Sequence, residues 1–135
     1  MITIIIGAVA TFVFGYLWYG PVFGKQWMKL MNMTSEGMER AKQGGMAGKM
    51  TVMGVTTIIT AWAVYYILPH TLPNPVPLSF GQFFKFIFVI WLGFGFPVQL
   101  GAYLWEGKSW KLVAFNAAES VLSFLILSAI IFFWR

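Results

Sequence analysis

The chain has 135 residues, of which 59% are hydrophobic and 10% charged, with a mean hydropathy of +0.77; it is too apolar for an ordinary soluble protein and too short for more than one domain, residues 1–135. The formal net charge of +5 comes from basic residues in two short segments, so we expect no nucleic-acid partner, which would require a broad basic face. Cysteine is absent, which excludes disulfides, thiolate metal sites and cysteine nucleophiles.

The first apolar stretch runs from about residue 2 to residue 22, and roughly 20 apolar residues are enough to cross a bilayer as a helix. No basic residue precedes the stretch, and the pattern Ala8-Val9-Ala10 lies too early for a signal-peptide cleavage site. We therefore expect this segment to remain attached as a helix. Gly7 and Gly15 share one of its faces, where small residues let neighbouring helices pack closely.

The connection after this stretch, residues 23–45, is predicted to contain short helical segments. The string GKQWMKLM at residues 24–31 mixes lysines with Trp and Met, as an amphipathic helix at a membrane interface does. Thr34 can cap a second short helix that carries Glu36, Glu39 and Arg40. The glycine pair at residues 44–45 is expected to end that helix.

Three further apolar stretches occur at about residues 46–68, 80–104 and 112–134. Each is too long for a barrel strand, which would show about ten residues of alternating polarity. Between the second and third, residues 69–77 include four prolines, so we expect an extended strap and no helix there. Gly93 and Gly101 are predicted packing positions on the third stretch. The predicted fold is therefore an all-α, integral membrane four-helix bundle with a short amphipathic interfacial segment between the first and second spans.

The basic residues predict the orientation of the bundle in the membrane. The first connection and its immediate continuation carry five cations, the third connection carries Lys108 and Lys111, and the second carries none. Because positive residues favour the cytoplasmic side, we expect loops 23–45 and 105–111 in the cytoplasm and both termini outside. The predicted location is the cytoplasmic (inner) membrane of a bacterium.

Residues near the ends of the spans are predicted to anchor the bundle at the two membrane interfaces. Tryptophan is typical of these levels, and a lysine one turn inside a helix end can extend its ammonium group to the headgroups. The predicted interfacial anchors are Trp18, Trp27, Lys85, Trp105 and Trp110.

Glu119 is the most unusual residue of the chain, because a carboxyl group in the middle of a span costs several kcal/mol and its short side chain cannot reach the interface. With Asn116, Ser120 and Ser123 it forms a polar stripe at spacings of three and four, which must face other helices. A rise of about 1.5 Å per residue places residues of the other spans at the same depth. We predict a buried polar cluster of Tyr16, Thr57, Gln99, Asn116 and Glu119.

Two interpretations of this cluster remain open. Glu119 either binds a proton or a cation on a translocation path, or forms hydrogen bonds that hold helices together. An enzyme is not expected, because the sole histidine, His70, has no cysteine, aspartate or second histidine to complete a metal or catalytic set. No metal site and no cofactor are predicted, and the known catalytic and nucleotide-binding motifs are absent from the sequence.

Three strings in the sequence resemble one known family. They are FGYLWYGPVFGKQWM at residues 14–28, WLGF at residues 91–94 and WEGKSWKL at residues 105–112. Their order and spacing are similar to those of a bacterial membrane family catalogued as domain of unknown function 1761 (DUF1761), over essentially the whole chain. The resemblance implies a four-helix membrane protein of unassigned activity, and it implies no site residue.

The sequence thus favours a non-enzymatic membrane protein of unassigned activity that associates with further copies of itself. A second hypothesis is a small proton- or cation-coupled transporter or channel that uses Glu119. A third is an accessory subunit that docks on a larger membrane complex through its glycine faces and aromatic ends.

Overall fold

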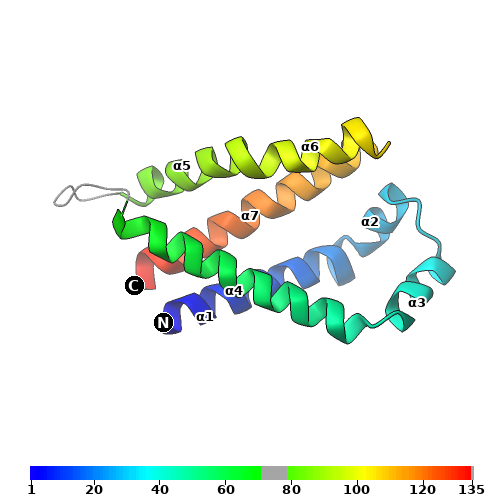
Figure 1. Ribbon diagram of the computed structural model, residues 1–135, viewed down its shortest axis with the longest axis horizontal. Helices are drawn as coiled ribbons and strands as arrows, with labels where there is room; N and C mark the ends of the chain where they lie inside the picture. The colour runs from blue at the N-terminus through cyan, green and yellow to red at the C-terminus, as the bar shows by residue number, and fades with distance from the viewer. Residues whose placement is uncertain (71–78, 135) are drawn as a thin grey trace.

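The computed structural model describes residues 1–70 and 79–134, except for the side chains of Ala41, Trp105 and residues 68–70. Four long helices form the bundle (Figure 1). They are α1 (Ile2–Leu17) with its π-helical continuation η1 (Trp18–Val22); α4 (Met46–His70); α5 (Phe80–Ile90), η2 (Trp91–Gly95) and α6 (Phe96–Trp105) in one continuous rod; and α7 (Trp110–Trp134).

The predicted all-α, four-helix fold is confirmed. Among the described residues, four helices are long and apolar enough to cross a membrane, at Ile2–Val22, Met46–Ile67, Phe80–Leu104 and Trp110–Trp134. The prediction of an extended strap at 69–77 is wrong for residues 69 and 70, since α4 continues to His70. A proline in the last turn of a helix keeps a helical φ and loses only one hydrogen bond, so the helix can include it. The rest of the strap and the side chains of His70 and Trp105 lie outside the described residues.

The connection between the first two spans folds as predicted into two short helices, α2 (Gly24–Leu30) and α3 (Ser35–Gln43). The Thr34 hydroxyl accepts a hydrogen bond of 3.1 Å from the backbone N–H of Gly37 and thereby caps α3. Gly44 ends the helix, and Gly45 comes next with φ +91, a conformation that favours glycine. The amphipathic segment is therefore confirmed in its two parts.

The two ends of the bundle differ in what they contain. One end, called the basic end below, holds α2, α3 and the turn between α6 and α7 (Figure 1). The opposite end, called the terminal end, holds the first residues of α1 and the last residues of α7, where the Thr3 hydroxyl donates a hydrogen bond of 2.9 Å to the carbonyl of Trp134.

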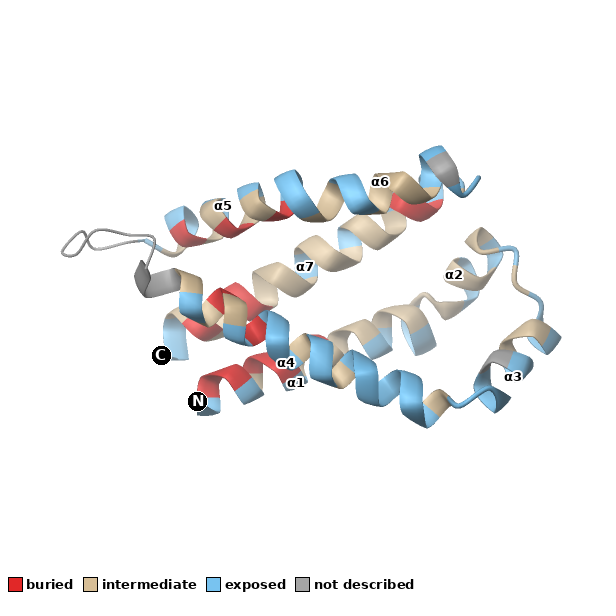
Figure 2. Ribbon diagram, in the orientation of Figure 1, coloured by how far each residue is buried: buried red, intermediate tan, exposed pale blue. Residues whose placement is uncertain are grey.

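The core of the bundle lies toward the terminal end, where Figure 2 shows most of the buried residues in red. Two helices approach closely at Gly7, since a Cβ atom added there would lie 2.7 Å from Leu127 Cδ1. The core consists of small and branched apolar side chains and one phenylalanine: Ile4, Ala8, Ala61, Val64, Phe83, Ile87, Leu127 and Ile131. Small residues thus let α1, α4 and α7 come together at this end.

Two of the spans contain a π-helical segment beside a proline. Pro21 lies inside η1, where Gly20 leaves helical geometry with φ −109 and ψ −107. Pro97 lies just after η2, at the start of α6. Proline lacks the N–H that the preceding turn would use, and a π turn is one way for a helix to absorb the irregularity. Side chains beyond each segment are rotated relative to a regular α-helix.

Candidate functional site

A groove of about 1140 Å³ lies between α1, α4 and α7 and reaches from the middle of the bundle to α2 and α3 at the basic end. One face of α4 forms a wall of this groove, at positions spaced by three and four: Met46, Lys49, Met50, Met53, Thr56, Thr57 and Thr60. The same helix is buried in the core further on, at Ala61 and Val64. The groove therefore begins where α4 no longer packs against α1 and α7.

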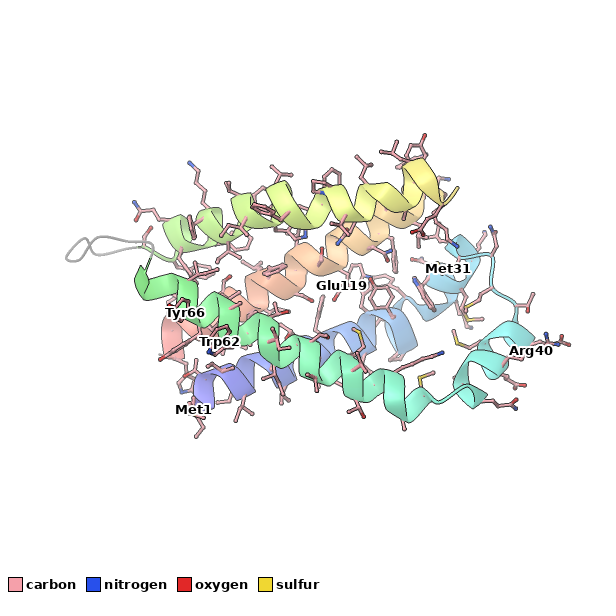
Figure 3. The ribbon with its side chains drawn as sticks, in the orientation of Figure 1. Met1, Met31, Arg40, Trp62, Tyr66 and Glu119 are labelled. Carbon is pink, nitrogen blue, oxygen red and sulfur yellow. The ribbon has the colours of Figure 1, made fainter. Side chains whose placement is uncertain are left out.

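Glu119 lines this groove from α7, and its side chain lies near the middle of the bundle in Figure 3. The side chain is half-buried. Its Oε1 atom accepts a hydrogen bond of 2.7 Å from the Ser123 hydroxyl, one turn further along the same helix. A Cβ atom added to Gly15 of α1 would lie 3.5 Å from this oxygen. The carboxyl group thus lies against the backbone of α1 and borders open space.

Hydroxyl groups surround this part of the groove. Thr57 donates to the Met53 carbonyl at 2.7 Å, and Thr60 donates to the Thr56 carbonyl at 3.0 Å. On α1, Thr11 donates to the Gly7 carbonyl at 2.9 Å. A hydroxyl that donates to its own helix keeps its oxygen lone pairs as acceptors. Carboxylate and hydroxyl oxygens together are ligands that suit a proton or a hard cation.

The part of the groove toward the basic end is apolar, with lysines at its rim. Six of the eight methionines of the chain line it: Met28, Met33, Met38, Met46, Met50 and Met53. Methionine is flexible and polarisable, so such a wall adapts to ligands of different shape. The rim carries Lys25 of α2, Lys42 of α3 and Lys49 of α4, all with exposed side chains.

A second set of polar side chains connects α7 to the third long helix, the continuous rod of α5, η2 and α6 that is called the third helix below. The Ser120 hydroxyl accepts hydrogen bonds from the indole N–H of Trp91 at 2.8 Å and from Nε2 of Gln99 at 3.0 Å, and donates to the Ala117 carbonyl at 3.2 Å. Trp91 is buried, and a Cβ atom added to Gly95 would lie 2.9 Å from its ring. The irregular segment η2 therefore places this indole against Ser120.

The five residues predicted from their depth to form one cluster do not all lie together: some line the groove, and others bond to Ser120 or Tyr19. Tyr16, Thr57 and Glu119 do line the same groove, but Tyr16 is 56% exposed and is not buried as expected. Gln99 bonds to Ser120 instead, and Asn116 accepts a hydrogen bond of 3.0 Å from the hydroxyl of Tyr19.

The sequence interpretation missed two hydrogen-bond donors, Tyr19, which bonds to Asn116, and Trp91, which bonds to Ser120. Depth along a helix predicts the level of a side chain but not its direction, and both residues lie in π-helical segments that rotate the helix face. The prolines at 21 and 97 are the signal in the sequence that could have indicated such irregularities.

The predicted packing glycines fall into two pairs. Gly7 and Gly15 of α1 lie close to α7, as the Leu127 and Glu119 contacts show. Gly93 and Gly101 of the third helix have open space beside them within the described part of the chain, so they do not pack against another span there. Their role as packing positions stays a prediction, and it would apply to contacts with another protein chain.

The predicted anchors also differ from one another. Trp18 is half-buried among protein rings, with centroids 4.6 Å from Phe23 and 5.3 Å from Phe115, and its position at the membrane interface stays a prediction. Aromatic residues at a helix end look alike in sequence whether they point inward or outward. Trp110 and Lys85 are exposed, and Trp27 is half-buried against Tyr19.

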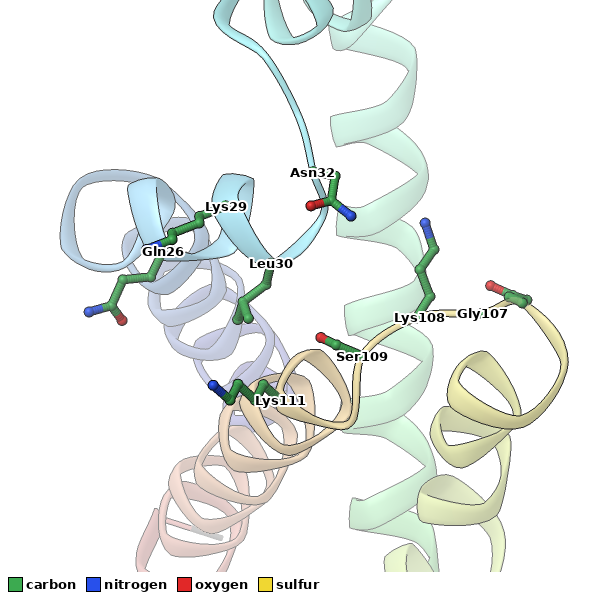
Figure 4. A pocket seen from close by; sticks show the side chains of 9 residues that line it. Gln26, Lys29, Leu30, Asn32, Gly107, Lys108, Ser109 and Lys111 are labelled. Carbon is green, nitrogen blue, oxygen red and sulfur yellow. The ribbon is translucent and has the colours of Figure 1, made fainter.

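A smaller hollow of about 680 Å³ lies at the basic end, between α2 and the turn before α7 (Figure 4). Seven of the nine described residues that line it are polar or charged: Gln26, Lys29, Leu30, Asn32, Glu106, Gly107, Lys108, Ser109 and Lys111. It brings the two basic connections together, and it carries three lysines but no methionine wall. Within the described residues, no group of three or more His, Asp or Glu side chains could hold a metal ion.

Comparison with known protein families matches residues 2–132 to the model of DUF1761, described as a protein of unknown function. The chain belongs to this family. No curated protein and no solved structure matches the chain. Membership in DUF1761 agrees with the resemblance noted in the sequence and assigns no activity, so the groove and its residues are the basis for a functional argument.

Proposed function

We propose that the protein is a small, non-enzymatic transporter or channel of the bacterial cytoplasmic membrane, in which Glu119 binds a proton or a small inorganic cation. The observation that supports this proposal is that Glu119 lines a groove extending to the basic end of the bundle. In the expected orientation, with both termini outside and loops 23–45 and 105–111 in the cytoplasm, this groove opens toward the cytoplasm.

The position of Glu119 suits such a role. It lies nine residues after Trp110, which corresponds to a depth of about 14 Å along α7. A carboxyl group at this depth costs several kcal/mol in hydrocarbon unless water or polar partners reach it. The groove supplies the space for water, Ser123 donates a hydrogen bond to the carboxyl group, and the threonine hydroxyls of α4 line the same groove. The alternative, a carboxyl group that only holds helices together, would not need the groove.

The experiment is an ion-flux assay in proteoliposomes with the wild type, Glu119→Gln and Glu39→Gln. Glu39 is an exposed acidic residue of α3 that does not line the groove, so its substitution removes the same charge elsewhere. We expect flux of protons or of a monovalent cation in the wild type and in Glu39→Gln, and flux at the level of empty liposomes in Glu119→Gln. Equal flux in all three proteins, or none above empty liposomes in any, would reject the proposal.

Association with other copies, or with a larger membrane complex, is supported by the third helix. Its glycines at 93 and 101 have open space beside them among the described residues, and Phe94 and Val98 are 78% and 77% exposed. Small residues on a lipid-facing helix are typical of helix–helix contacts in membranes. Native mass spectrometry from mild detergent separates the two cases, because self-association gives multiples of one mass and a complex gives a second subunit.

A further inference from the structure

The groove between α1, α4 and α7 combines two surfaces that a small ion does not need: an apolar methionine wall and a rim of three lysines. We propose that this part of the groove binds one anionic phospholipid, with an acyl chain along the methionine wall and the phosphate at Lys25, Lys42 and Lys49. The inference does not rest on the proposed function, because it uses the methionines and lysines and not Glu119.

The size and lining of the groove indicate an apolar ligand. Its volume of about 1140 Å³ is slightly above the range of sites for drug-sized molecules, which is about 300–1,000 Å³, and is far larger than an ion requires. Met50 and Met53 are 36% and 57% exposed in this wall. An unbranched acyl chain fits an unbranched thioether wall well, because both adapt their torsions to each other.

The order of residues along α4 matches the order of groups in a phospholipid. After Met46, the first residue of the helix, Lys49 lies near the basic end, Met50 and Met53 come next toward the middle, and all four line the groove. Lysines at the headgroup level attract anionic lipids, and basic pockets between helices bind their headgroups. A charged rim continuous with an apolar wall is complementary to a molecule with one anionic end, whereas free phosphate would use the rim alone.

The three lysines come from three different elements. Lys25 belongs to α2, Lys42 to α3 and Lys49 to α4, and all three line the same groove. A lipid phosphate bound there would link these elements, and its acyl chain would lie along the methionines at the basic end of the groove, short of Glu119.

The polar hollow of Figure 4 provides a matched control within the chain. It also carries three lysines, Lys29, Lys108 and Lys111, but no methionine of the described residues lines it. The two triple variants K25Q/K42Q/K49Q and K29Q/K108Q/K111Q therefore remove the same charge from the same end of the bundle. General attraction of a basic surface to anionic lipid would fall equally in both.

The test is native mass spectrometry of full-length protein reconstituted from vesicles of equal parts phosphatidylglycerol and phosphatidylcholine. We expect one phosphatidylglycerol per chain to remain bound in the wild type and in K29Q/K108Q/K111Q. In K25Q/K42Q/K49Q, the preference for phosphatidylglycerol is expected to fall on the order of tenfold or more. Equal loss in both triple variants, loss only in K29Q/K108Q/K111Q, or equal retention of the two lipids in the wild type would overturn the proposal.

A second variant tests the acyl chain separately. Met53→Trp places a bulky ring in the groove beside the other methionines and leaves all lysines in place. Bound phosphatidylglycerol should therefore be lost, while helical content by circular dichroism stays the same. Met53 is exposed, so this change does not disturb the core. Retention of the lipid in Met53→Trp, or its displacement from the wild type by soluble glycerophosphate, would show that only the headgroup is bound and would reject the proposed site.

Discussion

At the terminal end of the bundle, α1, α4 and α7 pack around buried apolar side chains, whereas at the basic end the same three helices line an open groove. On α4 the change occurs within a few residues: Ala61 and Val64 are buried, while Met53 is 57% exposed. Small residues allow close approach of helices, and long, polar or charged side chains occupy the face where the helices diverge. The difference shows that one face of a helix can serve as core at one end and as a site at the other.

The largest expected effect is at the terminal end, where removing a core side chain leaves a cavity. Ile131 is fully buried in the core, so Ile131→Ala should lower the free energy of unfolding by about 2–5 kcal/mol. The control at the basic end is Met53→Ala, which should change it by less than about 1 kcal/mol because this side chain is exposed. Unfolding by SDS titration in mixed micelles measures both; similar losses would contradict the contrast between the ends.

A smaller effect is expected at Gly7, where α1 packs closely against α7. Gly7→Leu should cost about 1–3 kcal/mol, because even its Cβ atom would lie 2.7 Å from Leu127 Cδ1 and the rest of the side chain would push the helices apart. Gly101→Leu is the matched control, since open space lies beside this glycine in the described part of the chain. Thermal unfolding in the same detergent compares them. A larger loss for Gly101→Leu would mean that the third helix, and not α1, forms the critical contact.

The smallest effect is expected at Ser120, which lines the groove and joins α7 to the third helix. Ser120→Ala removes the acceptor of the Trp91 and Gln99 hydrogen bonds, and hydrogen bonds between membrane helices average about 0.6 kcal/mol with a maximum near 1.7. We expect a loss of about 1 kcal/mol. Thr51→Ala, which removes a bond within one helix, is the control. A double-mutant cycle with Trp91→Phe should give a coupling energy; no coupling would mean that the indole bond contributes nothing to stability.

The spans could be predicted from sequence because their length and hydropathy depend only on crossing a bilayer. The observed span Phe80–Leu104 coincides with the prediction, and the Thr34 cap of α3 was predicted from local chemistry alone. The depth of Tyr16, Thr57 and Glu119 was also predictable, since the rise per residue is constant. These three residues do share the groove.

The faces of the helices and the groove could not be predicted. Tyr19 replaces Tyr16 as the partner of Asn116 within a π-helical segment, and such a segment rotates the helical residues beyond it. The open space beside α4 depends on where four helices separate, and this is a property of the assembled bundle. No periodicity within a single span contains that information.

The hydrogen bond from Thr3 to the carbonyl of Trp134 joins the beginning of the first helix to the end of the last one. Toward the basic end the same two helices are joined again, where the Tyr19 hydroxyl donates a hydrogen bond to Asn116 and Trp18 packs against Phe115. Because α1 and α7 are fastened at both ends, they form one fixed unit, and α4, whose described side chains are buried only at Ala61 and Val64, is the lever whose tilt would widen or narrow the groove. Lys49 lies in the first turn of α4, far from this pivot, so such a tilt would move it more than it moves Glu119 on the fixed pair.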